Sequence, residues 1–351
     1  MLFIIMIGII FILATVWYLR DSTRKPLQDI NPELTAWVTD WQWQPGLDDL
    51  KVVTESLSSI QMFGVYFDEA DQLFLTKQTY EALPHVMDAS GYYHSVPVYL
   101  TIVNDRIKKD GSTVQKDPAL LNRLLATKEA RNRHIDDIVE LMKTHQVQGI
   151  EIDYENVNEN DWEHVSVFYS ELYQRLHQMG KKLRIVLESK AKIEGLTFPD
   201  GPDYVMMAYN LYGGHSGPGP KADYSFITKT SKKLSMLPGK HFIALSAGGF
   251  DWPETGKAKA LTEEQAAELT RRSTQVPQRD PASGSVYFTY LDDSKVKHTV
   301  WFADQGTLTQ WAEAARKAGI GKIALWRLGG LQQATLNRID QVWKGTSPHN
   351  P

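Results

Sequence analysis

Apolar residues follow two patterns along most of the chain: short runs of strand length, and longer stretches in which they recur every three or four positions. The second pattern is clear at Ile135, Ile138, Val139 and Met142, where the spacing predicts the buried face of a helix. Strands that alternate with helices are typical of a parallel sheet covered on both faces. Eight strands are predicted, at residues 34–43 (including an aromatic loop), 60–67, 96–103, 148–155, 183–187, 204–209, 241–246 and 322–327.

Eight strand and helix units predict an α/β fold, a (β/α)8 TIM barrel over residues 33–345. The interval between strands 7 and 8 is long, and it contains a helix-start signal, Thr262-x-x-Gln265. Two alternating runs, 285–291 and 296–302, predict a hairpin there, so we expect a small hairpin-containing insertion between strands 7 and 8. The alternative is an open doubly wound sheet, but no Gly-x-Gly-x-x-Gly turn follows strand 1 to favour it.

The first 20 residues differ from the rest because 2–19 form an almost continuous apolar run of membrane-spanning length. A membrane anchor or signal segment is therefore expected at 1–20, with a linker at 21–32 and a tail at 346–351. No clear small-x-small cleavage site follows, which favours an uncleaved anchor. The basic residues after the run favour a cytoplasmic domain, but long domains follow this rule poorly. We expect the barrel to be extracytoplasmic and membrane-anchored, or secreted if the segment is cleaved.

Composition narrows the choice of partners and cofactors. A formal net charge of −4 and the lack of a Lys/Arg-rich run argue against nucleic-acid binding. The chain has no cysteine, which excludes disulfides and thiolate zinc sites. The acidic cluster described below lacks histidine neighbours, so we expect neither a metal nor another cofactor. The barrel is expected to be monomeric.

The fourth predicted strand carries three carboxylates at alternate positions, Glu151, Asp153 and Glu155. Alternate side chains of a strand share one face at intervals of roughly 7 Å, so the three acids lie together. Such a face is unfavourable in a strand, and a solvated face is unusual in a parallel sheet. A functional role is therefore favoured over a merely exposed acidic edge.

Active residues of a barrel gather at the carboxyl ends of its strands. Asn104, Tyr209 and Trp326 end strands 3, 6 and 8, and Trp41 and Trp43 follow strand 1, where they are candidates for a sugar-stacking platform.

Glycoside cleavage needs a carboxylic acid that protonates the leaving oxygen. Glu155 is nearest the barrel mouth, and repulsion among the three acids should raise at least one pKa of the group. Most retaining enzymes add a carboxylate nucleophile, but strand 7 carries no carboxylate before Asp251. Glu188, at the end of strand 5, is interpreted as structural or rim-exposed rather than as that nucleophile.

These residues make the chain resemble glycoside hydrolase family 18, the chitinase-like enzymes. The family's strand-four signature, Asp-Gly-x-Asp-x-Asp-x-Glu, is matched at Gly149, Asp153 and Glu155. The chain has Glu instead of Asp at 151 and Gln instead of Asp at 148. The residue at 148 is expected to have a structural role. Residues 207–210, Met-Ala-Tyr-Asn, resemble the family's Met-x-Tyr-Asp. Residues 325–329, Leu-Trp-Arg-Leu-Gly, resemble its strand-eight tryptophan in the branch that acts on bacterial cell walls and spore coats.

The resemblance implies hydrolysis of β-linked N-acetylglucosamine polymers, chitin-like or peptidoglycan, in which the substrate's acetamido oxygen acts as nucleophile. It implies that Glu155 is acid and then base, that Asp153 orients the acetamido group and that Tyr209 hydrogen-bonds the acetamido oxygen. Substrate-binding residues are expected to be Glu151, Asn210, Trp326, Asn104 and Trp41. The alternative is a chitinase-like lectin that binds without cleaving. Such lectins usually lose the last Glu of the motif, and this chain keeps it.

Overall fold

A computed structural model describes residues 32–91, 96–273 and 275–343. Its central feature is a closed barrel of eight parallel strands, because β1 pairs with both β15 and β2. The barrel strands are β1 (Glu33–Thr39), β2 (Ser59–Phe67), β4 (Val98–Ile107), β6 (Gly149–Asp153), β7 (Lys182–Leu187), β8 (Asp203–Met207), β9 (Lys240–Ser246) and β15 (Lys322–Trp326). The predicted (β/α)8 barrel is thereby confirmed.

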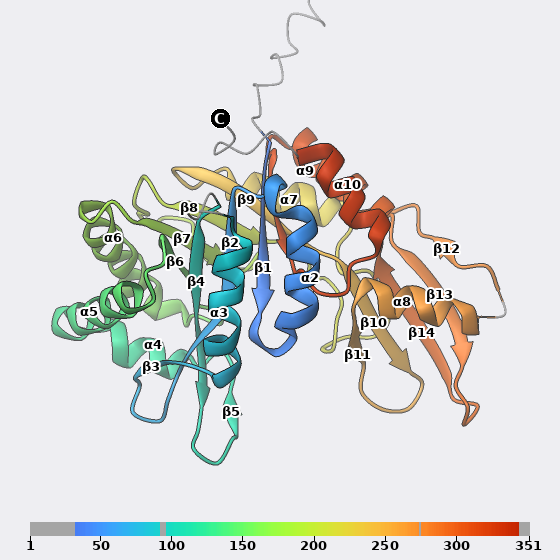
Figure 1. The fold of residues 1–351 in the computed structure, drawn as a ribbon, viewed down its shortest axis with the longest axis horizontal. Helices are drawn as coiled ribbons and strands as arrows, with labels where there is room; N and C mark the ends of the chain where they lie inside the picture. The colour runs from blue at the N-terminus through green and yellow to red at the C-terminus, as the bar shows by residue number, and fades with distance from the viewer. Residues whose placement is uncertain (1–31, 92–95, 274, 344–351) are drawn as a thin grey trace, which may run out of the picture.

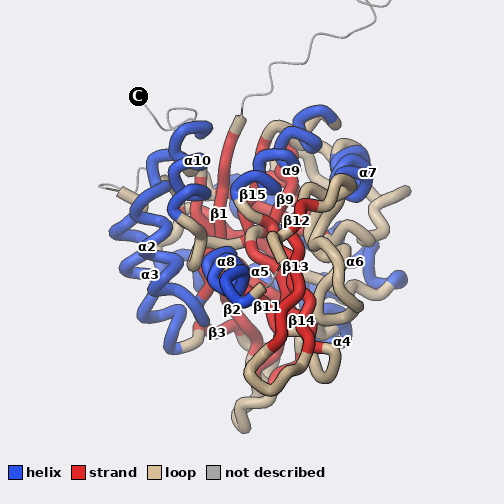
Figure 2. Tube along the Cα trace, turned by 90° about the vertical axis from the view of Figure 1, so that its right-hand side faces the viewer, coloured by secondary structure: helices blue, strands red, loops and turns tan. Residues whose placement is uncertain are grey.

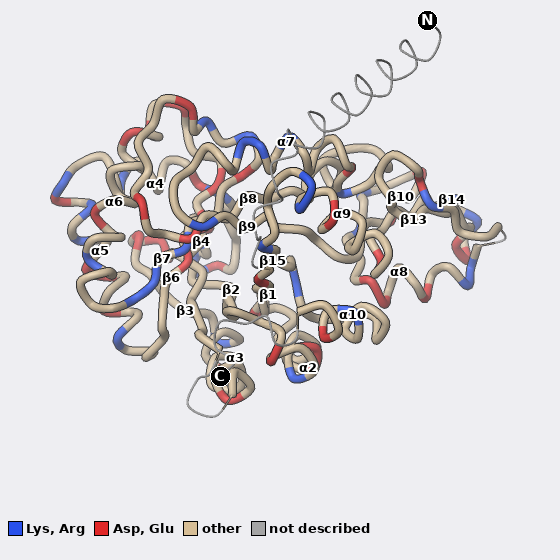
Figure 3. Tube along the Cα trace, turned by 90° about the horizontal axis from the view of Figure 1, so that it is seen from above, with Lys and Arg blue, Asp and Glu red and all other residues tan. Residues whose placement is uncertain are grey.

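A ring of helices surrounds the strands (Figures 1 and 2). Side-chain caps define several of the helix starts; the hydroxyl of Thr127, for example, accepts a hydrogen bond from the amide of Ala130 at the start of α5. The helices are α2 (Trp43–Val53), α3 (Lys77–Ala89), α4 (Pro118–Leu125), α5 (Lys128–His145), α6 (Trp162–Gln178), α7 (Tyr224–Leu234), α9 (Gln305–Lys317) and α10 (Gln333–Trp343). Acidic and basic residues are interspersed over these outer helices and loops (Figure 3).

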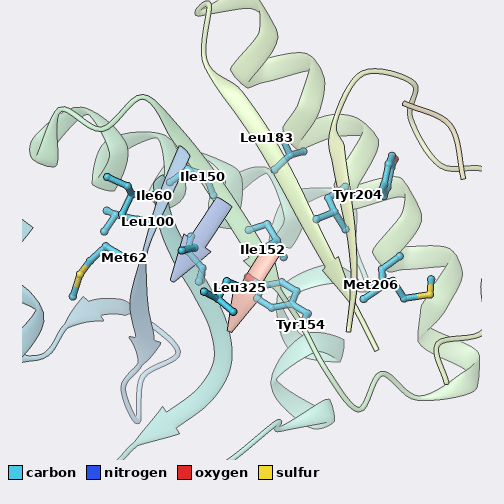
Figure 4. Packing of buried hydrophobic residues seen from close by; sticks show 14 of the residues in the cluster. Ile60, Met62, Leu100, Ile150, Ile152, Tyr154, Leu183, Tyr204, Met206 and Leu325 are labelled. Atoms are coloured by element: carbon cyan, nitrogen blue, oxygen red, sulfur yellow. The ribbon is translucent and has the colours of Figure 1, made fainter. Parts of the chain in front are cut away.

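Alternation along the strands divides the core into two parts. Residues such as Ile150 and Ile152 point outward and pack against the helices (Figure 4). Tyr154 belongs to the same outer layer, where its hydroxyl lies 2.6 Å from Nε2 of the buried His134. The barrel interior holds a smaller aromatic-rich cluster and the acidic face of β6. The backbone of β6 thus directs its apolar side chains into the core and its acids into the barrel.

The insertion between β9 and β15 is larger than the predicted hairpin. The hairpin is present as β13 (Val286–Leu291) and β14 (Lys297–Ala303), and the capping box at Thr262 and Gln265 opens α8 (Glu263–Leu269). β10 (Gly248–Pro253), β11 (Lys259–Leu261) and β12 (Gln278–Arg279) complete an antiparallel five-stranded sheet at one side of the barrel (Figures 1 and 2). β11 and β12 are very short, and β10 contains Gly and Pro, so the three sequences carry little strand signal.

Two further short strands, β3 (Leu73–Leu75) and β5 (Thr113–Val114), pair antiparallel with the carboxyl-terminal parts of β2 and β4. They extend one side of the barrel mouth. Across the described residues, no helix has the length and apolarity needed to cross a bilayer. The apolar run predicted to do so, residues 2–19, lies outside them.

Candidate active site

Glu151 lies deepest of the three acids and is fully buried. Its carboxylate accepts hydrogen bonds from Trp37 Nε1 at 2.6 Å, Thr101 Oγ1 at 2.8 Å and Arg184 Nε at 2.6 Å. It lines neither cavity described below. Glu151 was predicted to bind substrate; in the structure its carboxylate is instead hydrogen-bonded by side chains of β1, β4 and β7 inside the barrel.

The Glu151–Arg184 ion pair gives a stability prediction. Replacing Arg184 with Met would leave an uncompensated charge inside the barrel, and we expect the free energy of unfolding to fall by about 3–5 kcal/mol. Chemical denaturation monitored by circular dichroism measures this loss. Arg175→Met removes a surface pair with Asp136 and should cost no more than about 1 kcal/mol. Equal losses in the two variants would show that the buried pair has no special importance.

Asp153 is buried at the last position of β6, and its side chain lines the cavity at the barrel mouth. Its Oδ1 atom has no hydrogen-bond partner among the described residues. Burial raises the pKa of Asp153 well above its usual value, and the neighbouring charges of Glu155 and Glu151 raise it further. Asp153 therefore keeps one carboxyl oxygen, Oδ1, free of hydrogen bonds from the described residues, and its charged form is disfavoured.

Glu155 follows β6 by two residues, and Asn104 at the mouth of β4 fixes its backbone. Asn104 Nδ2 donates to the carbonyl oxygen of Glu155, and Asn104 Oδ1 accepts from its amide, both at 2.9 Å. Both ends of the Asn104 amide are occupied in this way. Asn104 was predicted to bind substrate; although it lines the cavity, the structure uses its amide to position Glu155.

The carboxylate of Glu155 lies 2.5 Å from the ammonium group of Lys116. Burial raises the pKa of Glu155 to about 7, the charge of Lys116 opposes this rise, and Glu188 adds to it. Glu188 itself accepts a hydrogen bond from the amide of Asn156 at 2.8 Å and pairs with Lys190 at 3.2 Å. Glu155 therefore titrates near neutral pH, as a general acid and base should.

Lys116 is a site residue that sequence reasoning missed. It lies in the loop between β5 and α4, where its backbone adopts a left-handed φ of 52° and its amide donates to Asp105 Oδ1 at 2.7 Å. A single lysine in a polar loop carries no sequence signal, because only the closed barrel brings it to Glu155.

Removing Lys116 should shift the pH profile of any activity that needs protonated Glu155. Such activity is lost as pH rises through the pKa of Glu155, and the positive charge of Lys116 holds that pKa down. Lys116→Ala therefore raises the pKa and moves the alkaline limb of kcat/KM to higher pH. Lys116→Arg keeps the positive charge, so the alkaline limb of kcat/KM should stay near its wild-type position. The control variant Lys109→Ala, which removes an exposed lysine, should also leave that limb unchanged. An alkaline limb that moves to lower pH in Lys116→Ala would contradict this electrostatic role.

An aromatic floor lies beside the acids. The rings of Trp326 and Tyr209 are stacked, with centroids 6.3 Å apart and planes 11° apart, and Phe63 contacts Trp326 edge-on at 5.3 Å. Trp41 stands at the rim, 55% exposed and 6.4 Å from Trp326. Trp43 instead starts α2 and stacks on His85 at 5.4 Å, so its predicted place in a sugar platform is wrong.

Two adjoining cavities occupy the barrel mouth. The first, of about 500 Å³, contains Asp153 and Glu155, and the second, of about 430 Å³, extends toward the insertion. Four residues line both: Trp41, Tyr209, Asn210 and Trp326. The structure thus brings most of the predicted site residues to one continuous cleft.

Gln148 and the loop at 213–220 both lie outside the two cavities. Gln148 is structural, because its Oε1 accepts a hydrogen bond from the amide of Val98 at the start of β4, at 2.8 Å. The Gly- and Pro-rich loop at 213–220 lines neither cavity. Trp252 Nε1 donates to the carbonyl oxygen of Ser216 at 3.0 Å, so the loop rests on the insertion.

The sequence profile described as "Glycosyl hydrolases family 18" matches residues 112–330, which include the acidic strand, Tyr209 and Trp326. The chain belongs to this family. Family 18 membership confirms the resemblance and makes the chain a glycosidase.

Similar proteins place it near the spore and cell-wall members of family 18. "Uncharacterized glycosylase YvbX" of Bacillus subtilis is 27% identical over 244 residues, 65% of this chain and 69% of that protein. "Cortical fragment-lytic enzyme" of Bacillus anthracis is 26% identical over 230 residues, and the match spans 60% of this chain and 53% of that enzyme, about half its length. The spore cortex-lytic enzyme SleL of Bacillus cereus shares the fold, with a TM-score of 0.75 and 19% identity over 90% of this chain and 76% of SleL.

Proposed function

We propose that the chain hydrolyses β-linked N-acetylglucosamine polymers, chitin-like or peptidoglycan, by a substrate-assisted mechanism that retains the anomeric configuration. The observation that carries this proposal is the pairing of Glu155, whose pKa is about 7, with Asp153, whose Oδ1 is buried and unpartnered. The two acids share one cavity above an aromatic floor.

The other carboxylates that line this cavity are already engaged. Asp40 accepts hydrogen bonds from Tyr66 at 3.0 Å and Thr76 at 2.8 Å, and Asp105 accepts from the amide of Lys116. β9 ends at Ser246 instead of an acid. These contacts favour a nucleophile supplied by the substrate.

In the proposed reaction, Glu155 donates its proton to the leaving glycosidic oxygen while the acetamido oxygen attacks the anomeric carbon. Asp153 would accept a hydrogen bond from the acetamido N–H and stabilise the positive charge of the ring that forms. The hydroxyl of Tyr209 would bind the acetamido oxygen, and Trp326 would lie beneath the sugar. Glu155 would then take a proton from the water that opens the ring, which restores the starting state.

The experiment is a comparison of wild-type protein and Glu155→Gln on chitin oligomers and on purified peptidoglycan. Release of new reducing ends by the wild type alone supports the proposal. Binding of either glycan with no release by the wild type would identify the alternative function, a lectin.

A further inference from the structure

The second cavity carries positive charge that the proposed reaction does not use. Its walls come from the end of β9, from residues 259–265 of the insertion and from residues 326–331 after β15. Arg327 follows the floor tryptophan directly, and Lys221 faces the same space. Trp41, Tyr209, Asn210 and Trp326 join this space to the acid pair.

Neither cation has an acidic partner among the residues that the structure describes. Arg327 Nη1 is buried without a hydrogen-bond partner there, and its guanidinium carbon lies 5.7 Å from the ring of Trp41. Lys221 Nζ donates to two neutral oxygens, Ser246 Oγ at 2.8 Å and the carbonyl of Ala247 at 2.9 Å. Burial, together with the nearby charge of Arg327, lowers the pKa of Lys221 to about 7.

Several other partly buried cations in the described structure do have an acidic partner. Arg131 pairs with Glu171, Arg184 with Glu151, and Lys116 with Glu155. An unpaired cation that has lost part of its hydration is unfavourable, and two that repel each other are more so. A bound anion would relieve both.

Glu263, the acidic residue that lines this cavity, does not pair with Arg327 or Lys221. Glu263 is buried in the cavity wall, where its carboxylate accepts from Thr335 Oγ1 at 2.7 Å and from the amide of Gln332 at 3.1 Å. Lys259, exposed at the rim, adds a third positive charge. The space is therefore suited to a carboxylate supplied by the ligand.

We propose that Arg327 and Lys221 form a carboxylate-binding subsite, which takes the lactyl carboxylate of an N-acetylmuramic acid unit beside the sugar held over Trp326. This inference rests on the proposed function and selects peptidoglycan strands over chitin as its substrate. Chitin is uncharged and would leave both cations without a partner. A planar guanidinium and an ammonium group are suited to share one carboxylate.

The test compares peptide-free peptidoglycan tetrasaccharides with chitotetraose, using kcat/KM for the wild type and affinity by calorimetry for Glu155→Gln. We expect a preference for the muramic glycan, and the ratio of its kcat/KM to that of chitotetraose should fall about ten- to a hundredfold in Arg327→Met and in Lys221→Met. Lys257→Met, an exposed cation outside the cavity, is the matched control and should keep the wild-type ratio.

A muramic glycan whose lactyl carboxylate is methyl-esterified tests the subsite without altering the fold. The ester should lose the wild-type preference and bind Glu155→Gln like chitotetraose. An ester that binds as tightly as the acid, or a wild type that favours chitotetraose, would overturn the subsite. If the wild type cleaves neither glycan, the proposed hydrolysis fails, while preferential binding of the acid over its ester would still support the subsite.

Discussion

Glu155→Gln should lower kcat by about 10²–10⁴-fold, the range that general acid–base catalysis contributes. Glutamine keeps the size of the side chain and can still accept a hydrogen bond from Lys116, but it cannot protonate the leaving oxygen. Substrate affinity should stay close to that of the wild type, because the aromatic floor and Asp153 are unchanged. Initial rates and equilibrium binding on the same soluble oligosaccharide measure both quantities.

The matched control is Glu159→Gln. Glu159 is an exposed carboxylate four residues further along, where it pairs with Lys192 at 2.6 Å. Its loss should leave kcat within experimental error of the wild type. If Glu155→Gln retains more than about a tenth of wild-type kcat, the acid has been misassigned, since even the lower end of the expected range is a hundredfold.

Asp153→Asn should be the second most damaging change, with kcat lowered by about 10²–10³-fold, comparable to the loss of one preorganised electrostatic group in an active site. Asparagine matches the shape of the carboxyl group. It carries no negative charge that could stabilise the positively charged ring formed by the acetamido group. The defect should therefore appear mainly in kcat and only weakly in substrate affinity.

Asp105→Asn is the control for this variant, because Asp105 lines the same cavity and asparagine can still accept the amide hydrogen of Lys116. Its effect on kcat should be much smaller. The double variant Glu155→Gln/Asp153→Asn should lose little more than Glu155→Gln alone, since residues that act as a unit give non-additive losses. Multiplicative losses in the double variant would contradict a shared role.

Strand periodicity was sufficient to predict the barrel because each parallel strand is a short apolar run between helices, a local property of the sequence. The boundaries were less exact: β6 ends at Asp153 and β8 at Met207, so Glu155 and Tyr209 follow their strands instead of ending them. The insertion sheet was only partly predicted, because β11 and β12 are very short.

The roles of single residues depended on the closed barrel. Alternation alone places Glu151 with Asp153 and Glu155, but Arg184 on β7 and Trp37 on β1 determine that Glu151 is satisfied inside the barrel. Lys116 and Arg327 are likewise brought to the cleft by tertiary structure. Motif spacing predicts which side chains share a face, whereas the partner of each charge comes from elements distant in sequence.

The anomeric configuration of the first product tests the central claim most directly. Proton magnetic resonance spectra recorded during the first minutes of hydrolysis of a β-linked N-acetylglucosamine oligomer, before mutarotation, distinguish the two anomers. Attack by the substrate's acetamido oxygen predicts that the β-anomer appears first in the wild type, with no product from Glu155→Gln. An α-anomer as first product would contradict the substrate-assisted mechanism, and the absence of product from wild-type protein on both chitin oligomers and peptidoglycan would contradict the proposed hydrolysis.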